Sequence, residues 1–245
     1  MQHGVIQADG RLYVDNSILA TEAVCQTHAS LRYGLGYDAP GVRVKMNVGT
    51  AIHAGMDVFF AGGSVPDVLA AFEKAYTAMG IGQAIAAMDE KQQKGLQAYT
   101  LANLKVIVGE YCTRNAMLPF EVDTTTIEQG FAVLLDREFN IWYTGTPDVG
   151  KVVMRGSGSV YTVDTKSTGS YLTAEYKRGY RTASQVTGYL WGLREVTGLP
   201  YVGAFINAIN IKKIPDSNRR CSDHGVQSSE CGLLHAEMAL FPVTR

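Results

Sequence analysis

A chain of 245 residues, 46% hydrophobic and 18% charged, has the composition of a globular protein that can bury one large core. No run of about 18 apolar residues occurs, which argues against a membrane span. Residues 1–4 lack the basic and apolar regions of a secretory signal. We therefore expect a cytoplasmic protein that has no membrane partner.

The net charge of −1 hides an uneven distribution along the chain. Residues 1–150 carry 10 Lys or Arg against 16 Asp or Glu, whereas residues 151–220 carry 11 against 4. A local basic segment attracts phosphate even in a protein that is neutral overall, so nucleic acid is not excluded as a partner. The same excess is also typical of a solvated basic surface, and charge alone leaves the two interpretations open.

The first 115 residues are predicted to be mainly helical. Apolar residues recur there at helical spacing, and Ser17, Asn47 and Pro66 stand where helices characteristically begin. Four helices are expected, over residues 17–32, 48–61, 66–79 and 83–112.

The pattern changes after Pro119, where β-branched and aromatic residues alternate with Gly-Ser turns. We expect a meander of short antiparallel strands, then a helix over 182–197 that ends before Gly198, and then further strands. The predicted strands are residues 125–127, 131–135, 141–144, 151–154, 159–164, 202–211 and 239–243. This order predicts one mixed α/β domain, with a helical portion over 1–115 and a sheet core over 116–245.

Two acidic residues and a lysine stand at the predicted strand ends. Asp148 follows the strand over 141–144, and Asp164-Thr165-Lys166 ends the strand over 159–164. Neighbouring strands of a meander bring their ends together, so we expect the two carboxylates to lie close to each other. Two such groups suit a hard divalent cation such as Mg²⁺. Asp164 and Lys166 face the same side of a strand, so the lysine can stabilise charge in metal-assisted hydrolysis. Taken singly, each acid also fits a turn or an ion pair.

Pro147-Asp148, fifteen residues and then Asp164-x-Lys166 resemble the signature of the PD-(D/E)xK nuclease superfamily. Residues 15–213 resemble its RecB-like branch, which includes phage and CRISPR-associated exonucleases. The motifs that carry this likeness are the segment 16–25, Gly49-x-x-x-His53 and Gln185-x-x-x-Tyr189. The resemblance implies a restriction-endonuclease-like core, in which helices flank a central mixed sheet. It also implies a metal-dependent DNA nuclease, most often an exonuclease, acting in recombination, repair or phage DNA processing.

The resemblance also implies a set of metal ligands. His53 is expected to join Asp148 and Asp164, and its imidazole makes Mn²⁺ an alternative to Mg²⁺. On an apolar helix, His53 also fits the role of a core histidine. The family has one more acidic residue near the first core strand, for which we choose Glu128, with Glu121 as the competitor.

Other residues are expected to support catalysis and grip DNA. Gln185 and Tyr189 lie one helical turn apart and would orient the lysine or a phosphate, although packing is their alternative role. Cations alternate with tyrosines over 171–181, as suits a groove for single-stranded DNA, but also a solvated connection. The cations are Lys177, Arg178 and Arg181, followed by a second basic stretch of Lys212, Lys213, Arg219 and Arg220. Such contacts grip phosphate without reading sequence.

The four cysteines are scattered and do not form a disulfide framework. Some RecB-like relatives hold an iron–sulfur cluster with one early and three late cysteines, but only Cys221 and Cys231 follow the early Cys25 here. His224 and His235 complete a set of zinc-type ligands with these two late cysteines, but the spacing is irregular. We therefore favour free cysteines over an iron–sulfur cluster or a zinc site.

The predicted partner is DNA, as single strands or duplex ends, together with a single-strand-annealing or helicase protein. The predicted location is the cytoplasm, or the host-cell cytoplasm if a phage encodes the chain. Two alternatives stay open. A catalytically silent DNA-binding or assembly module on the same fold is disfavoured because Asp148, Asp164 and Lys166 are all present. A hydrolase of another phosphate substrate is disfavoured by the basic, tyrosine-rich segment, which suits a polymer.

Overall fold

The structure, a computed structural model, describes residues 4, 6–37, 41–212 and 238–244. The helices are α1 (Asn16–Val24), α2 (Gln26–Ala29), α3 (Val44–Phe60), α4 (Val65–Ala78), α5 (Ile81–Ala86), α6 (Glu90–Gly95), α7 (Leu101–Arg114), α8 (Ala174–Gly179) and α9 (Ser184–Thr197). Short helical turns are η1 (Ser30–Gly34), η2 (Gln97–Tyr99) and η3 (Thr124–Thr126). The strands are β1 (Leu12–Val14), β2 (Phe120–Val122), β3 (Phe131–Asp136), β4 (Ile141–Gly145), β5 (Val149–Met154), β6 (Val160–Thr168), β7 (Tyr201–Asn210) and β8 (Met238–Thr244). The chain is mixed α/β, as predicted.

The strands of the described residues form two sheets. The larger has the order β2-β5-β6-β7-β8, in which β6 and β7 are parallel and the other pairs antiparallel. The smaller has the order β1-β4-β3, with β1 parallel to β4. The predicted single meander is therefore wrong, because the chain leaves the smaller sheet at Gly145 and enters the larger one at Val149.

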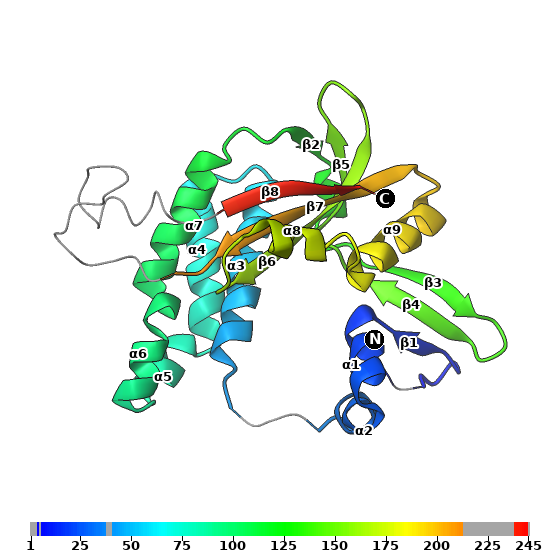
Figure 1. The fold of residues 1–245 in the computed structure, drawn as a ribbon, viewed down its shortest axis with the longest axis horizontal. Helices are drawn as coiled ribbons and strands as arrows, with labels where there is room; N and C mark the ends of the chain where they lie inside the picture. Colours follow the sequence, from blue (N-terminus) through cyan, green and yellow to red (C-terminus); the bar gives the residue numbers. More distant parts are fainter. Residues whose placement is uncertain (1–3, 5, 38–40, 213–237, 245) are drawn as a thin grey trace.

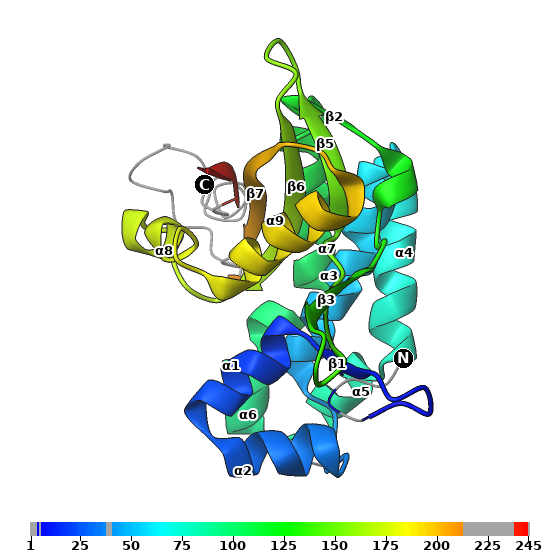
Figure 2. The same cartoon turned by 90° about the vertical axis from the view of Figure 1, so that its right-hand side faces the viewer.

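Helices cover both faces of the larger sheet. On one face α3, α4 and α7 lie side by side (Figure 1), and Ile52 and Phe72 share a core with Val163 of β6. On the other face lies α9 (Figure 2), where Leu190 packs in a second core with Ile206 of β7. A sheet with parallel strands and two apolar faces needs such cover on both sides.

Helix α3 carries one of the predicted site residues and begins four residues before its predicted start at 48. Val48, Ile52 and Met56 recur every four residues and are fully buried, so this face packs on the core. The predicted helix over 66–79 is confirmed as α4, within one residue at each end.

The predicted single helix over 83–112 is wrong. It is divided into α5, α6, η2 and α7, because local side chains start new helices inside it. Asp89 forms a capping box with Gln92 that begins α6. Thr100 has extended backbone angles and separates η2 from α7.

The predicted helix over 17–32 is also interrupted. Asp15, rather than Ser17, caps α1 by accepting a hydrogen bond from the backbone of Ile18. Cys25 is extended, with φ −158°, and ends α1 before α2 starts. Both Asp15 and Ser17 lie within one turn of the first apolar residue of this helix. The sequence alone therefore offers two candidates for the N-cap, which explains why the cap differs from the predicted one.

Two other segments differ from the prediction. Residues 125–127 are not a strand, because Asp123 accepts a hydrogen bond from the Thr125 backbone and closes the 3-10 turn η3. The segment over 171–181 contains a helix, α8, capped by Thr173. Among the described residues, no helix combines the length and apolar character needed to cross a membrane. The candidate DNA-binding residues and the candidate cluster or zinc ligands of the late part of the chain lie outside the described residues: Lys213, Arg219, Arg220, Cys221, His224, Cys231 and His235.

Candidate metal centre and active site

Asp148 sits where the two sheets meet. It directly precedes β5, and the antiparallel register of Val149 with Val163 places it beside Asp164 of β6. Its carboxylate is buried; Oδ1 lies 2.9 Å from His53 Nδ1, and Oδ2 accepts a hydrogen bond from the Thr165 backbone. Asp148 therefore links α3, β5 and β6 at one point, instead of closing β4 as predicted.

Asp164 and Lys166 lie within β6, which continues to Thr168, and not at a strand end as predicted. Lys166 Nζ lies 2.8 Å from Asp164 Oδ2, and the carboxyl group is buried while the lysine keeps 27% of its side chain exposed. Between them Thr165 turns to the other face, where its hydroxyl accepts a hydrogen bond from Asn207. The ammonium group of the lysine is therefore held beside a buried carboxyl group, while part of the lysine side chain stays exposed.

His53 reaches this position because α3 packs closely on β6. A Cβ atom on Gly49 would lie 3.1 Å from Ser167 Oγ, so a glycine allows the helix to approach the strand. One turn later, His53 is half-buried against Asp148. Burial lowers the pKa of the imidazole, but the hydrogen bond and the charge of Asp148 outweigh it, and the pKa is raised overall.

Glu128 lies in the loop before β3 with a left-handed φ of 51°, which is uncommon for a residue other than glycine. Its backbone N–H donates to the carbonyl of Asp148 at 3.0 Å, which holds the residue there. Burial, together with the negative charges of Asp148 and Asp57, raises the pKa of the Glu128 carboxyl to about 7. The competitor Glu121 lies on β2 opposite Val153, toward the other end of β5 from Asp148.

Within the described residues, His53, Glu128 and Asp148 form a group that could hold a metal ion. One ligand atom from each lies within 4.8 Å of the others. Asp164 neighbours this group but pairs with Lys166, and burial raises its pKa. Several carboxylates with raised pKa values around one histidine form a site that binds protons when no cation is present.

Asp57 is a member of this cluster that the sequence reasoning missed. It follows His53 by four residues on α3, so both side chains lie on the same face of the helix. Burial and the charge of Asp148 raise the pKa of Asp57 to about 6. Its Oδ1 is buried and has no hydrogen-bond partner among the described residues. The spacing from His53 was the signal that could have identified it.

Asp57→Asn is expected to stabilise the metal-free protein at pH 8 but not at pH 4.5. A carboxyl whose folded pKa is about 6, raised from 3.8, stabilises the fold below pH 3.8 and loses that contribution as the pH rises through 6. After allowance for solvent screening, the gain at pH 8 is about 1 kcal/mol, or roughly 2–4 °C in Tm. Thermal unfolding in EDTA at both pH values measures it, and equal gains at both would contradict the electrostatic cause.

The backbone of Glu128 offers a second test, because strain at a site often accompanies function. Glu128→Gln keeps the strained backbone, whereas Glu128→Gly relieves it. Both variants are expected to lose about tenfold or more in Mn²⁺ affinity. The glycine variant should be about 1 kcal/mol more stable than the glutamine variant in urea unfolding. A glycine variant that is less stable, or a glutamine variant with full Mn²⁺ affinity, would contradict this reading.

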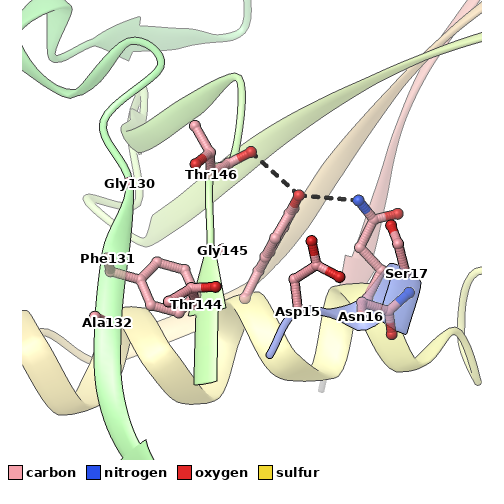
Figure 3. A pocket seen from close by; sticks show the side chains of 11 residues that line it. Asp15, Asn16, Ser17, Gly130, Phe131, Ala132, Thr144, Gly145 and Thr146 are labelled. Carbon is pink, nitrogen blue, oxygen red and sulfur yellow. Dashed lines mark hydrogen bonds between the residues drawn. The ribbon is translucent and has the colours of Figure 1, made fainter. Parts of the chain in front are cut away.

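Gln185 and Tyr189 form a chain of hydrogen bonds that reaches the connection between β4 and β5. Gln185 Nε2 donates to Tyr189 Oη at 2.9 Å, and Tyr189 Oη donates to the carbonyl of Thr146 at 3.1 Å (Figure 3). Burial and the nearby Asp164 charge raise the pKa of the Tyr189 hydroxyl. The pair therefore ties α9 to the chain two residues before Asp148.

The basic segment around α8 differs from a row of stacked aromatics. Tyr176 and Tyr180 are partly buried against the second core and pack edge to face on each other, with their hydroxyls 3.0 Å apart, so they do not form a row of parallel rings. Lys177 lies over the ring of Phe241 at 5.7 Å, and Arg178 pairs with Glu175. Arg181 is exposed next to α8. The exposed ring of Tyr171 carries Lys212 at 3.9 Å.

Two of the four cysteines are described, and both are free. Cys112 is buried on α7 and Cys25 is exposed between α1 and α2. The candidate zinc and iron–sulfur ligands in the late part of the chain lie outside the described residues.

No protein-family model matches the chain, and no curated protein is similar to it in sequence. A functional assignment therefore depends on the chemistry of the site.

Proposed function

We propose that the chain is a divalent-metal-dependent DNA nuclease of the PD-(D/E)xK type, acting as an exonuclease. The observation that supports this most is the placement of the Asp164–Lys166 pair on β6, beside the His53, Glu128 and Asp148 group. A lysine held next to a carboxylate-rich site is what phosphodiester hydrolysis requires, because negative charge develops on the phosphate in the transition state. The DNA substrate, the cytoplasmic location and a single-strand-annealing or helicase partner are parts of the same proposal.

In the proposed hydrolysis, some residues of the site bind the metal and others contact the phosphate. Asp148, Glu128 and His53 offer two carboxylates and an imidazole, a ligand set that suits Mg²⁺ or Mn²⁺. Such a cation, when bound, supplies charge for the phosphate oxygens and acidifies a coordinated water. Asp164 holds the ammonium of Lys166 at the edge of the site, where it contacts the phosphate. The pKa of Glu128 is raised to about 7, so a cation bound there would compete with a proton on this carboxyl near neutral pH.

One assay tests the proposal. The protein is incubated with end-labelled linear DNA and with closed circular DNA, in Mg²⁺, Mn²⁺ or EDTA, beside Asp164→Ala and Lys166→Ala. We expect metal-dependent loss of linear DNA, sparing of closed circles and no activity in either variant. Cleavage that persists in both variants would remove the mechanism. Binding of DNA without cleavage in any metal would favour the silent module.

A further inference from the structure

A pocket of about 550 Å³ opens next to the end of β4, and Figure 3 shows the side chains that line it. It lies between the first residues of α1, the paired strands β3 and β4, and the start of α9. Its volume falls in the range of small-molecule sites. Its rim includes Gly130, two residues after Glu128, and Thr146, two residues before Asp148. The rim of the pocket is therefore two residues along the backbone, at most about 7 Å, from each of two candidate metal ligands.

The walls of the pocket are aromatic and closely packed. Phe131 and Tyr189 meet edge to face, with ring centroids 6.2 Å apart. A Cβ atom on Gly145 would lie 2.7 Å from the Phe131 ring and 2.8 Å from the Tyr189 ring, so the missing side chain allows both rings to approach β4. The hydrogen bond from Tyr189 to Thr146 fixes this wall to the strand that leads into Asp148.

The polar groups of the pocket suit a neutral ligand with both donors and acceptors. Asn16 supplies its amide Nδ2 as a donor and Gln185 its Oε1 as an acceptor, because their other amide atoms bond to Ser184 and Tyr189. The Asp15 carboxylate also lines the pocket but serves as the cap of α1. Ser184 Oγ donates to Asn16 Oδ1 at 2.6 Å, which joins α1 to α9 across the pocket. No lysine or arginine is among the described residues that line it, and the one charged side chain is negative. A phosphate group is therefore disfavoured there, whereas the edge of a nucleobase, which carries donors and acceptors side by side, matches the two amides.

We propose that this pocket binds an unpaired nucleobase of the DNA strand, one nucleotide away from the scissile phosphate; this inference rests on the proposed nuclease function. A base inside a duplex cannot enter such a pocket until it leaves the stack. The protein therefore takes single strands or frayed ends, and the pocket adds base contacts to the sequence-independent grip on phosphate.

The test uses a fluorescein-labelled 12-nucleotide single strand in which an abasic site replaces each base in turn. Binding to the full chain is measured by anisotropy with Ca²⁺ in place of Mg²⁺, and gels confirm that the strand stays intact. We expect one or two adjacent abasic positions to weaken binding by about tenfold, the size of effect expected when the contacts of one base are lost. Equal affinity for all abasic strands would overturn the inference.

A variant pair locates the effect. Ser17→Phe places a ring at the mouth of the pocket from an exposed position of α1, and Ala23→Phe adds the same ring on an exposed part of α1 that does not line the pocket. Ser17→Phe should weaken binding of the intact strand by a similar factor and abolish the abasic effect, whereas Ala23→Phe should change neither. A Ser17→Phe protein that still shows the full abasic effect would overturn the inference.

The cleavage assay keeps the two proposals apart. If linear DNA is cleaved but all abasic strands bind with equal affinity, the base-binding proposal would be overturned and the nuclease proposal would stand. A clear abasic position without cleavage in Mg²⁺ or Mn²⁺ would remove the nuclease but keep the pocket as a base-binding site. Absence of binding to the strand together with absence of cleavage would overturn both.

Discussion

Lys166→Met is expected to slow phosphodiester hydrolysis by about 10²- to 10³-fold while Mn²⁺ affinity does not fall. Lys166 Nζ is 2.8 Å from Asp164 Oδ2, so its charge is held in place before the substrate arrives. Methionine keeps much of the chain length but removes the charge that stabilises the transition state. Loss of a neighbouring cation makes the carboxylate group more attractive to a metal, so the affinity should stay equal or increase.

Lys151→Met provides the matched control. Lys151 also lies on the larger sheet and pairs with an aspartate, Asp123, at 3.2 Å, but that pair is not part of the metal group. Single-turnover cleavage of linear DNA and calorimetric titration with Mn²⁺ should show near-normal values for this control. A Lys166→Met protein that loses metal affinity in parallel with its rate would mean that the lysine holds the site together and does not act on the phosphate.

Asp148→Asn is expected to reduce Mn²⁺ affinity by about 100-fold and hydrolysis by about 10³-fold or more. Both carboxylate oxygens of Asp148 have a defined partner: Oδ1 faces His53 and Oδ2 accepts from the Thr165 backbone. An asparagine of the same shape can satisfy only one of these positions as an acceptor, and it removes the negative charge from the centre of the group.

The control for this change is Glu110→Gln, which removes a carboxylate from the ion pair with Arg114 on α7. Circular dichroism should show that both variants fold. The His53 pKa, followed by NMR titration in EDTA, should drop in Asp148→Asn because the hydrogen bond and charge of Asp148 raise it in the native protein. Unchanged His53 titration, or full Mn²⁺ affinity in Asp148→Asn, would contradict the proposed ligand group.

Local patterns in the sequence determined the features that involve only neighbouring residues, such as helix positions and the faces of a strand. The period of two along a strand placed Asp164 and Lys166 on one face, and β6 has this arrangement. The apolar period of α3 and the positions of Pro66 and Gly198 predicted three helices to within a few residues. These features depend on backbone geometry over a few residues, so a single sequence is sufficient to predict them.

Contacts between distant segments were decided only by the tertiary structure. β1 pairs with β4 across some 130 residues, and β4 and β5 belong to different sheets although they follow each other closely. The same holds within the site, where the left-handed backbone of Glu128 and the approach of Asp57 to Asp148 arise from packing between segments. Register and sheet order depend on which apolar faces meet, and local propensity carries no information about that choice.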